Sequence, residues 1–167
     1  SQSVALGYKA VAGALGADNK IAGLSSVSIG SYTKTKGSYS VAIGYNTTAS
    51  TIGDIALGNT ATASGGGTVA LGTQAQTNGL YAVAIGTNSA ANSPSSVALG
   101  TNSTASVSGS VAIGAGSVAN RAAGVAGYDP STKTTSTKVD DSTWTSTAAA
   151  VAVGDADEGV TRQITGV

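Results

Sequence analysis

Few residues of this chain have side chains that could carry out chemistry. The sequence of 167 residues contains no His, no Cys and no Met, so it offers no imidazole base, no thiol nucleophile and no nitrogen or sulfur ligand for zinc. Ser and Thr hydroxyls are abundant, but a hydroxyl nucleophile needs a neighbouring base to activate it. No Gly-rich loop leads into a helix with a Lys, as a phosphate-binding loop would. The sequence therefore predicts neither an enzyme nor a cofactor.

The densest group of acidic residues lies near the C-terminus. Asp155, Asp157 and Glu158 stand just before Arg162. Carboxylate oxygens are the ligands that calcium prefers, so a calcium site is one interpretation of this group. We favour the other interpretation, an exposed turn in which Arg162 pairs with a carboxylate of the same or an adjacent chain. No metal is therefore predicted.

The charge balance excludes two classes of partner. Eight Lys and Arg residues balance eight Asp and Glu residues, and only 10% of all residues are charged. Without a basic field, neither nucleic acid nor a membrane surface is an expected partner. No apolar run approaches the roughly 18 to 20 residues of a membrane helix. Hydrophobic residues make up 41% of the chain but include 30 Ala, so no thick core is expected.

The sequence repeats itself every 14 residues through most of its length. The recurring unit is Val-Ala-(Ile or Leu)-Gly or a close variant. A weaker copy, Gly13-Ala14-Leu15-Gly16, lies one period earlier, and outlying copies begin at Val4 and Val151. These two irregular gaps indicate a shortened first turn and a long insertion before the last copy. The seven regular copies begin at Val27, Val41, Ile55, Val69, Val83, Val97 and Val111.

The positions within the repeat differ in character. The fourth is always Gly, which indicates a backbone shape at the end of a strand that a Cβ would hinder. The seventh and ninth are small and the eighth is usually polar, a period of two that is typical of a strand with one covered face. Positions ten to thirteen favour turns. Each repeat therefore predicts strand, corner, strand, corner, with the first corners at Gly44, Gly58, Gly72, Gly86, Gly100 and Gly114.

Such a repeat predicts one coil of an all-β parallel β-solenoid, whose successive coils pair about 4.8 Å apart. Two medium-sized apolar side chains per coil bury too little surface to offset the ordering of 14 residues, so a single roll is marginal. We expect the Ala or Ser column at position two to form a smooth side against which neighbouring subunits pack in a homo-oligomer. The residues expected to pack the roll or the oligomer are Val41, Ala42, Ile43, Ala56, Ala70, Val83, Ala84, Ile85, Ala98 and Ala112.

Two motifs resemble one known family, the heads of trimeric autotransporter adhesins of the YadA type. The first motif is Ser-Val-Ala-Ile-Gly, which stands here at residues 40–44 and 110–114. The second, residues 151–154 followed by 161–167, is similar to the neck that joins such heads to a coiled-coil stalk; it includes Arg162, Gln163 and Ile164. The resemblance implies a left-handed parallel β-roll assembled as an intertwined homotrimer. It also implies display on a Gram-negative outer membrane through a C-terminal region outside this sequence, with no membrane contact by the residues present.

The resemblance divides the chain into three parts. Residues 1–120 are expected to form the head repeats, 121–150 an insertion of the kind found before the neck, and 151–167 the last repeat strand and the start of the neck. Within the insertion, Tyr128-Asp129-Pro130 indicates a turn. Trp144 is the single Trp, and we expect it to anchor the insertion against the roll or a neighbouring subunit. A ligand contact is the alternative.

The function expected is attachment to host cells or to an extracellular matrix protein, such as a collagen-like protein, fibronectin or laminin. Many weak repeated contacts would provide avidity. Two alternatives stay open. Thr or Asn at position five (Asn59, Thr73, Thr87 and Thr101) is compatible with ice binding, although Ser31 and Tyr45 interrupt that column. The chain could also be a spacer, with adhesion elsewhere in the protein. The residues that bind a ligand are not predicted; the broad candidates are Thr48, Thr62, Gln76 and Thr104.

Overall fold

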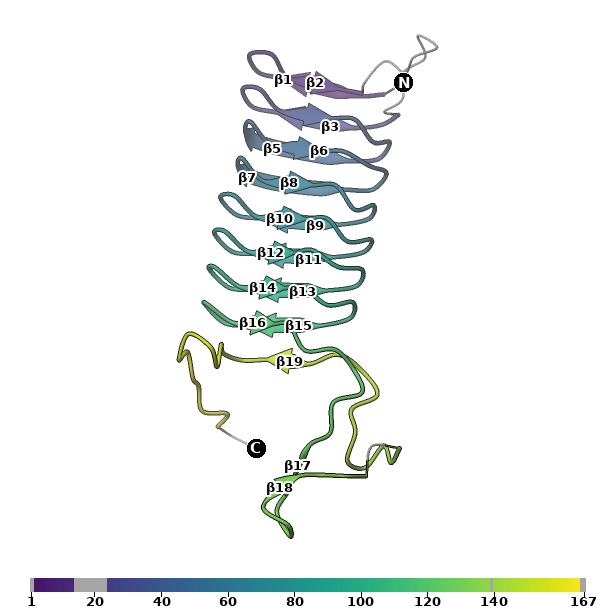
Figure 1. Cartoon of the computed structure of the whole chain (residues 1–167). Helices are drawn as coiled ribbons and strands as arrows, with labels where there is room; N and C mark the ends of the chain where they lie inside the picture. The colour runs from purple at the N-terminus through teal and green to yellow at the C-terminus, as the bar shows by residue number, and fades with distance from the viewer. Residues whose placement is uncertain (1, 14–23, 139, 166–167) are drawn as a thin grey trace.

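The chain forms a stack of flat coils built from two parallel sheets. The computed structural model describes residues 2–13, 24–138 and 140–165. Each coil passes through a strand of the first sheet, turns a corner, passes through a strand of the second sheet and turns again to reach the next coil (Figure 1). The first sheet has nine strands and the second has eight. The expected parallel β-roll of 14-residue coils is confirmed.

The strands are short because each corner removes residues from the pairing. The first sheet contains β1 (Val4–Leu6), β3 (Val27–Ile29), β5 (Val41–Tyr45), β7 (Ile55–Asn59), β9 (Val69–Leu71), β11 (Val83–Ile85), β13 (Val97–Leu99), β15 (Val111–Ile113) and β19 (Val151–Ala152). The second sheet contains β2 (Val11–Ala12), β4 (Lys34–Thr35), β6 (Thr48–Ala49), β8 (Thr62–Ala63), β10 (Gln76–Thr77), β12 (Ala90–Ala91), β14 (Thr104–Ala105) and β16 (Val118–Ala119).

The register of the sheets follows the sequence repeat. From β3 to β15, each residue of the first sheet pairs with the equivalent residue 14 positions on, as in Ala84 with Ala98. The two irregular gaps are also absorbed in register. At one end β1 pairs directly with β3, with Val4 opposite Val27, and at the other end β15 pairs with β19, with Val111 opposite Val151. Residues 14–23, which hold most of the weak copy, lie outside the described residues.

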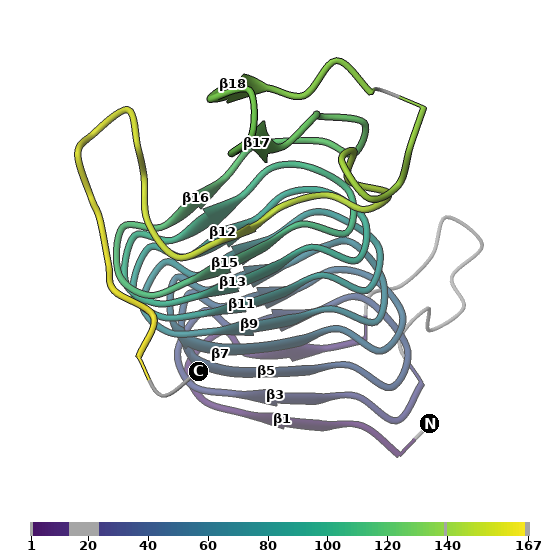
Figure 2. The same cartoon turned by 90° about the horizontal axis from the view of Figure 1, so that it is seen from below.

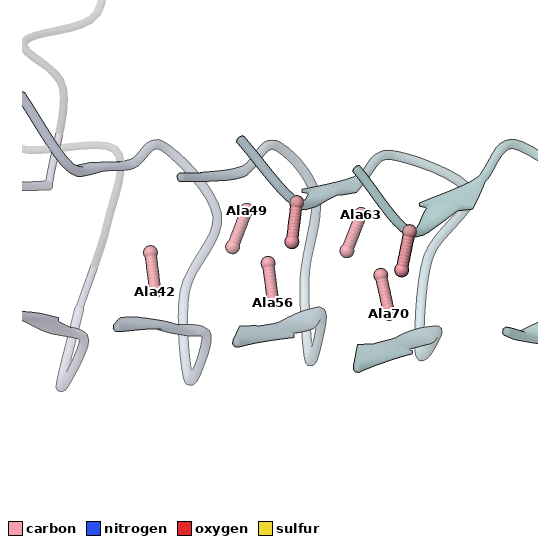
Figure 3. Close-up of a cluster of buried hydrophobic side chains, with 7 residues drawn as sticks. Ala42, Ala49, Ala56, Ala63 and Ala70 are labelled. Atoms are coloured by element: carbon pink, nitrogen blue, oxygen red, sulfur yellow. The ribbon is translucent and has the colours of Figure 1, made fainter. Parts of the chain in front are cut away.

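The interior of the roll is filled by small side chains. Figure 3 shows alanines of the first sheet pointing toward alanines of the second, for example Ala42 and Ala56 toward Ala49. These side chains are fully buried. Position two of the repeat supplies one half of this layer, and positions seven and nine supply the other. The roll is thin because only Ala, Ser and Thr fill most of the space between its sheets.

The corners need backbone conformations with positive φ. Gly86 has a φ of +135°, and a Cβ built there would lie 2.5 Å from the carbonyl oxygen of Gly100 in the next coil. Two residues later the chain is again in the left-handed region, at Asn88 with a φ of +55°. Buried hydroxyls then satisfy the corner carbonyls, as when Ser89 Oγ donates to the Gly86 oxygen at 2.8 Å. Glycine at this corner thus allows both the backbone shape and the close approach of the next coil.

One buried side chain at the other corner is a carboxylate. Asp54 takes the place that other coils give to Ser, Thr or Ala, and it is fully buried. Its Oδ2 accepts hydrogen bonds from Thr51 N (2.8 Å) and Thr51 Oγ1 (2.5 Å). Its Oδ1 accepts from Gly66 N (3.0 Å), Thr68 N (3.1 Å) and Thr68 Oγ1 (2.8 Å). Five donors from two successive coils thus replace the water that this carboxylate loses.

Residues beyond β16 leave the roll and return to it. They form an antiparallel hairpin of β17 (Tyr128–Asp129) and β18 (Thr134–Thr135) beyond the last coil, before β19 rejoins the first sheet (Figures 1 and 2). The turn between these strands begins at Pro130, as expected from the sequence. Within the described residues, no helix is long and apolar enough to cross a membrane.

Candidate assembly and binding surfaces

The alanine column at position two lies inside the roll. Ala42, Ala56, Ala70, Ala84, Ala98 and Ala112 are all fully buried between the two sheets. The expectation that this column faces a neighbouring subunit is therefore wrong. The physical reason is room: two sheets joined by corners of a few residues lie too close together for Val or Ile, so the smallest side chains point inward.

The larger aliphatic side chains of the first sheet point outward. Positions one and three carry Val, Ile or Leu in each coil from β3 to β15, and these residues are half-buried or exposed. Ile85 and Ile113 are 41% and 44% exposed. Because they alternate with the inward alanines, Val41, Ile43 and Val83 belong to the same outer columns. We call this surface, the outer side of the first sheet, the aliphatic face.

The aliphatic face is too large and too apolar to stay exposed to water. It follows two columns of branched side chains along a sheet of nine strands. Soluble monomers rarely expose continuous apolar patches larger than a few hundred Å². The face is also flat and regular, since equivalent residues of successive coils lie opposite one another in register. Such a surface is suited to association with an identical surface.

The outer side of the second sheet is polar instead. Thr48, Thr62, Gln76 and Thr104, the broad candidates for ligand contact, lie there in one column and are half-buried or exposed. The column has a hollow where Ala90 stands between Gln76 and Thr104. A shallow cavity of about 470 Å³ opens at this point, lined by Thr60, Gln74, Gln76, Asn88, Ser89 and Ala90.

Amide side chains form ladders along this polar side. Asn78 Nδ2 donates to Asn92 Oδ1 at 2.9 Å, and Asn88 Nδ2 donates to Asn102 Oδ1 at 3.2 Å. The partners in each pair are 14 residues apart, so the side chains repeat the backbone register. These ladders hold exposed amides in fixed positions, which makes the polar side a rigid array of donors and acceptors.

Arg162 of the expected neck contacts the last coil of the roll. Its Nη1 donates to Ser117 Oγ at 3.0 Å and to the carbonyl oxygen of Val153 at 2.5 Å, and its Nη2 donates to the carbonyl oxygen of Ala115. The guanidinium also lies 3.0 Å from where a Cβ on Gly114 would be. The expected pairing of Arg162 with a carboxylate of its own chain is not what the described residues show. Arg162 instead caps backbone carbonyls at the end of the stack.

The other neck residues take no regular structure. Gln163 and Ile164 are exposed and belong to no strand. The acidic group beside them forms a small hairpin: Asp155 and Val160 exchange backbone hydrogen bonds, and Asp155 Oδ1 accepts from the N–H of Asp157 at 3.1 Å. Nowhere in the described ranges do three acidic side chains gather so that they could hold a metal ion. A cavity of about 420 Å³ lies at this end of the roll.

Trp144 lies within the insertion. Its ring is half-buried beneath the ammonium of Lys138, which stands 5.5 Å from the ring centroid. Its backbone carbonyl accepts a hydrogen bond from the N–H of Gly127 at 2.6 Å. Both contacts are to other residues of the insertion. Trp144 therefore packs within the insertion, and its contact with a neighbouring subunit stays a prediction.

Sequence reasoning missed two features of these surfaces. One is Asp54, whose signal is an acidic residue in a column otherwise occupied by Ser, Thr or Ala. The other is a cluster of three tyrosines at one corner of the first coils, formed by Tyr8, Tyr32 and Tyr45. Its signal is that three of the six tyrosines occupy positions five and six of the repeat, where most later coils carry Thr, Asn or Gln.

The repeats match a family of known proteins. Residues 22–47, 36–61, 49–73, 63–89 and 91–117 each match the YadA head domain repeat, and together they span more than half of the chain. The chain therefore belongs to the family of YadA head domain repeats. The family and the fold are those of an adhesin head and not of an enzyme.

A solved structure shares the fold. The collagen-binding domain of the Yersinia adhesin YadA is similar to this chain with a TM-score of 0.63 and 24% sequence identity, over 95% of this chain and 75% of that one. At this identity the likeness concerns the fold. In a comparison with curated proteins, no sequence relative matches the chain.

Proposed function

We propose that this chain is the head of a homotrimeric surface adhesin that binds a host matrix protein. Membership of the YadA head family supports display at the cell surface and a role in adhesion. The neck residues at the end of the roll, with Arg162 against the last coil, fit a head that continues into a stalk and an outer-membrane anchor beyond residue 167.

The aliphatic face is the observation that carries the trimer. A single roll leaves two columns of Val, Ile and Leu in water on one side and presents a polar sheet on the other. Three rolls packed around a common axis would cover the aliphatic faces and leave the three polar sides outside. Burial of this surface then stabilises assembly by about 25 cal/mol for each Å² removed from water. The polar sides become the surface that a partner meets.

The fold of a collagen-binding head supports a matrix protein as the partner. The polar side of each roll presents a side chain at the same position of every coil, which suits a long partner with its own repeat. Individual contacts of Thr, Gln and Asn are weak, but many of them on three equivalent surfaces add up through avidity. A collagen-type protein is the matrix partner that has such a repeat.

Sedimentation of one pair of variants tests the trimer. Val83→Asp places a charge on the aliphatic face, and Thr62→Asp places the same charge on the polar side. We expect the wild-type chain and Thr62→Asp to sediment as trimers and Val83→Asp to lose the trimer. A trimer that withstands Val83→Asp would refute the assignment of this face.

A solid-phase assay tests adhesion. The trimeric head is expected to bind immobilised collagen, with fibronectin and laminin as comparison ligands. A trimer that binds none of these proteins or host cells would refute the adhesive role and leave the spacer. Thermal hysteresis of the solution without any matrix binding would instead establish ice binding through the position-five column.

A further inference from the structure

The three tyrosines at the corner of the first coils form a continuous aromatic ladder. The ring centroids of Tyr8 and Tyr32 are 5.4 Å apart at an interplanar angle of 84°, and those of Tyr32 and Tyr45 are 5.9 Å apart at 78°. Both are edge-to-face contacts. The side chains of Tyr8, Tyr32 and Tyr45 are 62%, 36% and 52% exposed. We call this group the tyrosine ladder.

The backbone holds the ladder in place. Tyr8 follows β1, Tyr45 ends β5, and Tyr32 lies between them in the left-handed region with a φ of +61°. Tyr32 N donates to the Tyr8 carbonyl oxygen at 2.8 Å. The ammonium of Lys9 lies 5.3 Å from the Tyr8 centroid and 5.6 Å from the Tyr32 centroid, which fixes both rings further. A partner would therefore meet rings that are already ordered, at little entropic cost.

The fold does not need aromatic residues at this corner. Later coils carry Thr73 with Gln74 and Thr87 with Asn88 at the same two positions. Gln74 and Asn88 adopt the same positive φ, of +57° and +55°, and their N–H groups make the same bonds to the coil before. Exposed tyrosines add nothing to that backbone. Their rings are therefore available for a role at the surface.

The spacing of the ladder matches one kind of extended chain. Tyr8 and Tyr45 both occupy position five of their coils and are two coils apart, which is about 9.6 Å along the stack. A polyproline-II helix has three residues per turn and rises by about 3.1 Å per residue, so equivalent residues recur about every 9.3 Å. Aromatic-lined surfaces are the common recognition sites for such chains.

We propose that the tyrosine ladder binds one polyproline-II chain of a collagen-type triple helix that lies along the stack of coils. Proline rings one turn apart pack on Tyr8 and Tyr45, with Tyr32 between them. The Tyr hydroxyls donate to backbone carbonyls, which have no internal partners in this conformation. This inference rests on the proposed adhesive function and assigns its first contact to the N-terminal end of the head.

The charges around the ladder favour an acidic segment of that partner. Lys9, Lys34 and Lys36 are exposed in these coils, and Asp54, the acidic residue described among them, is buried. The exposed acidic residues described elsewhere lie in the insertion and the neck, from Asp140 onward. Among the described residues, the coils of the ladder therefore expose only basic charges, whereas the insertion and the neck expose charges of both signs. We expect binding to weaken with rising salt.

A matched pair of variants tests the ladder. The first variant combines Tyr8→Ala, Tyr32→Ala and Tyr45→Ala. The second combines Tyr39→Ala and Tyr81→Ala, which are 65% exposed at the other corner of the roll. Both are measured by surface plasmon resonance against a triple-helical (Gly-Pro-Pro) peptide with flanking acidic residues and against full-length collagen. The ladder variant should bind at least about tenfold more weakly, as expected for the loss of aromatic anchors, and the control should bind as the wild type does.

The outcomes separate this inference from the proposed function. A wild-type head that binds no collagen would overturn the ladder, and one that also binds no other matrix protein and no host cells would overturn the proposed function as well. A head that binds collagen equally well with and without the three tyrosines would overturn only the ladder. Stronger binding of a single-chain proline-rich peptide, or of an anionic glycan, would overturn the collagen assignment. Loss of the trimer in the ladder variant alone, seen by sedimentation, would reassign the tyrosines to assembly.

Discussion

Replacement of Ala84 by Asp would place a carboxylate in the middle of the roll. Ala84 is fully buried, and its neighbours in register are Ala70 and Ala98. The backbone groups around it are already paired within the first sheet. The new carboxylate would therefore lose its water without gaining donors. This differs from Asp54, which is equally buried but accepts five hydrogen bonds.

The size of the effect follows from the cost of burying a charge. Full burial raises the pKa of an unpaired carboxyl by about 3 to 5 units, and each unit corresponds to about 1.36 kcal/mol, so the charged form costs about 4 to 7 kcal/mol. Typical domains are stable by only about 5 to 15 kcal/mol. We therefore expect Ala84→Asp to remove much of the stability of the protein at neutral pH. Because the carboxyl is protonated more readily in the folded state, stability should fall as the pH rises above about 4.

The assay is urea unfolding followed by far-UV circular dichroism at pH 3 and pH 7, with sedimentation in parallel. Thr62→Asp on the polar side is the control and should leave the unfolding midpoint nearly unchanged. The Ala84→Asp midpoint should be lower than that of the wild type at both pH values, and the difference should be larger at pH 7. A wild-type midpoint at pH 7 would refute the placement of the alanine column inside the roll.

Three further predictions concern the corner, the neck and the insertion. The strain of a Gly-only backbone conformation usually costs about 1 to 3 kcal/mol. Gly86→Ala should lower the free energy of unfolding by more than this, because the new Cβ would also clash with the Gly100 carbonyl. Thermal unfolding measures this loss. Arg162→Gln should speed amide exchange in the last coil and leave the central coils unchanged, since three acceptors lose their donor. The Ser131 hydroxyl and N–H donate hydrogen bonds to Asp129 and hold its pKa below the ordinary 3.8. The amides of the hairpin should therefore be fully protected from hydrogen exchange above that pH and lose protection as the pH falls through the lowered pKa. Asp129→Asn should abolish this pH dependence, as measured by NMR hydrogen exchange.

The periodicity of the sequence was sufficient to predict the coils. Gly at the fourth position of each repeat, small residues at the seventh and ninth, and turn formers after them each correspond to one place in the coil. Which face of the first-sheet strands points into the roll was not predictable in the same way. Its two faces are both apolar, so alternation alone could not say whether Ala42 or Val41 points inward. Side-chain volume decides this, since only Ala fits between sheets so close together.

The candidate surfaces were predicted less completely. Sequence reasoning named the polar column on the second sheet, but it could not find the tyrosine ladder, because Tyr8, Tyr32 and Tyr45 are 24 and 13 residues apart and meet only when the coils stack. The hydrogen-bond partners of Arg162 could not be predicted from the sequence for a similar reason. Its guanidinium meets Ala115 and Ser117, which lie across the whole insertion in the sequence.

The pairing of β15 with β19 across a long excursion shows how the length of the head can change. Each coil needs only a neighbour with the same 14-residue spacing above and below, so the stack accepts any insertion that returns in register. Duplication or deletion of one repeat during evolution would move the tip outward or inward by about 4.8 Å and leave the remaining contacts intact. The number of repeats thus sets the length of the head, and the structure of each coil stays the same.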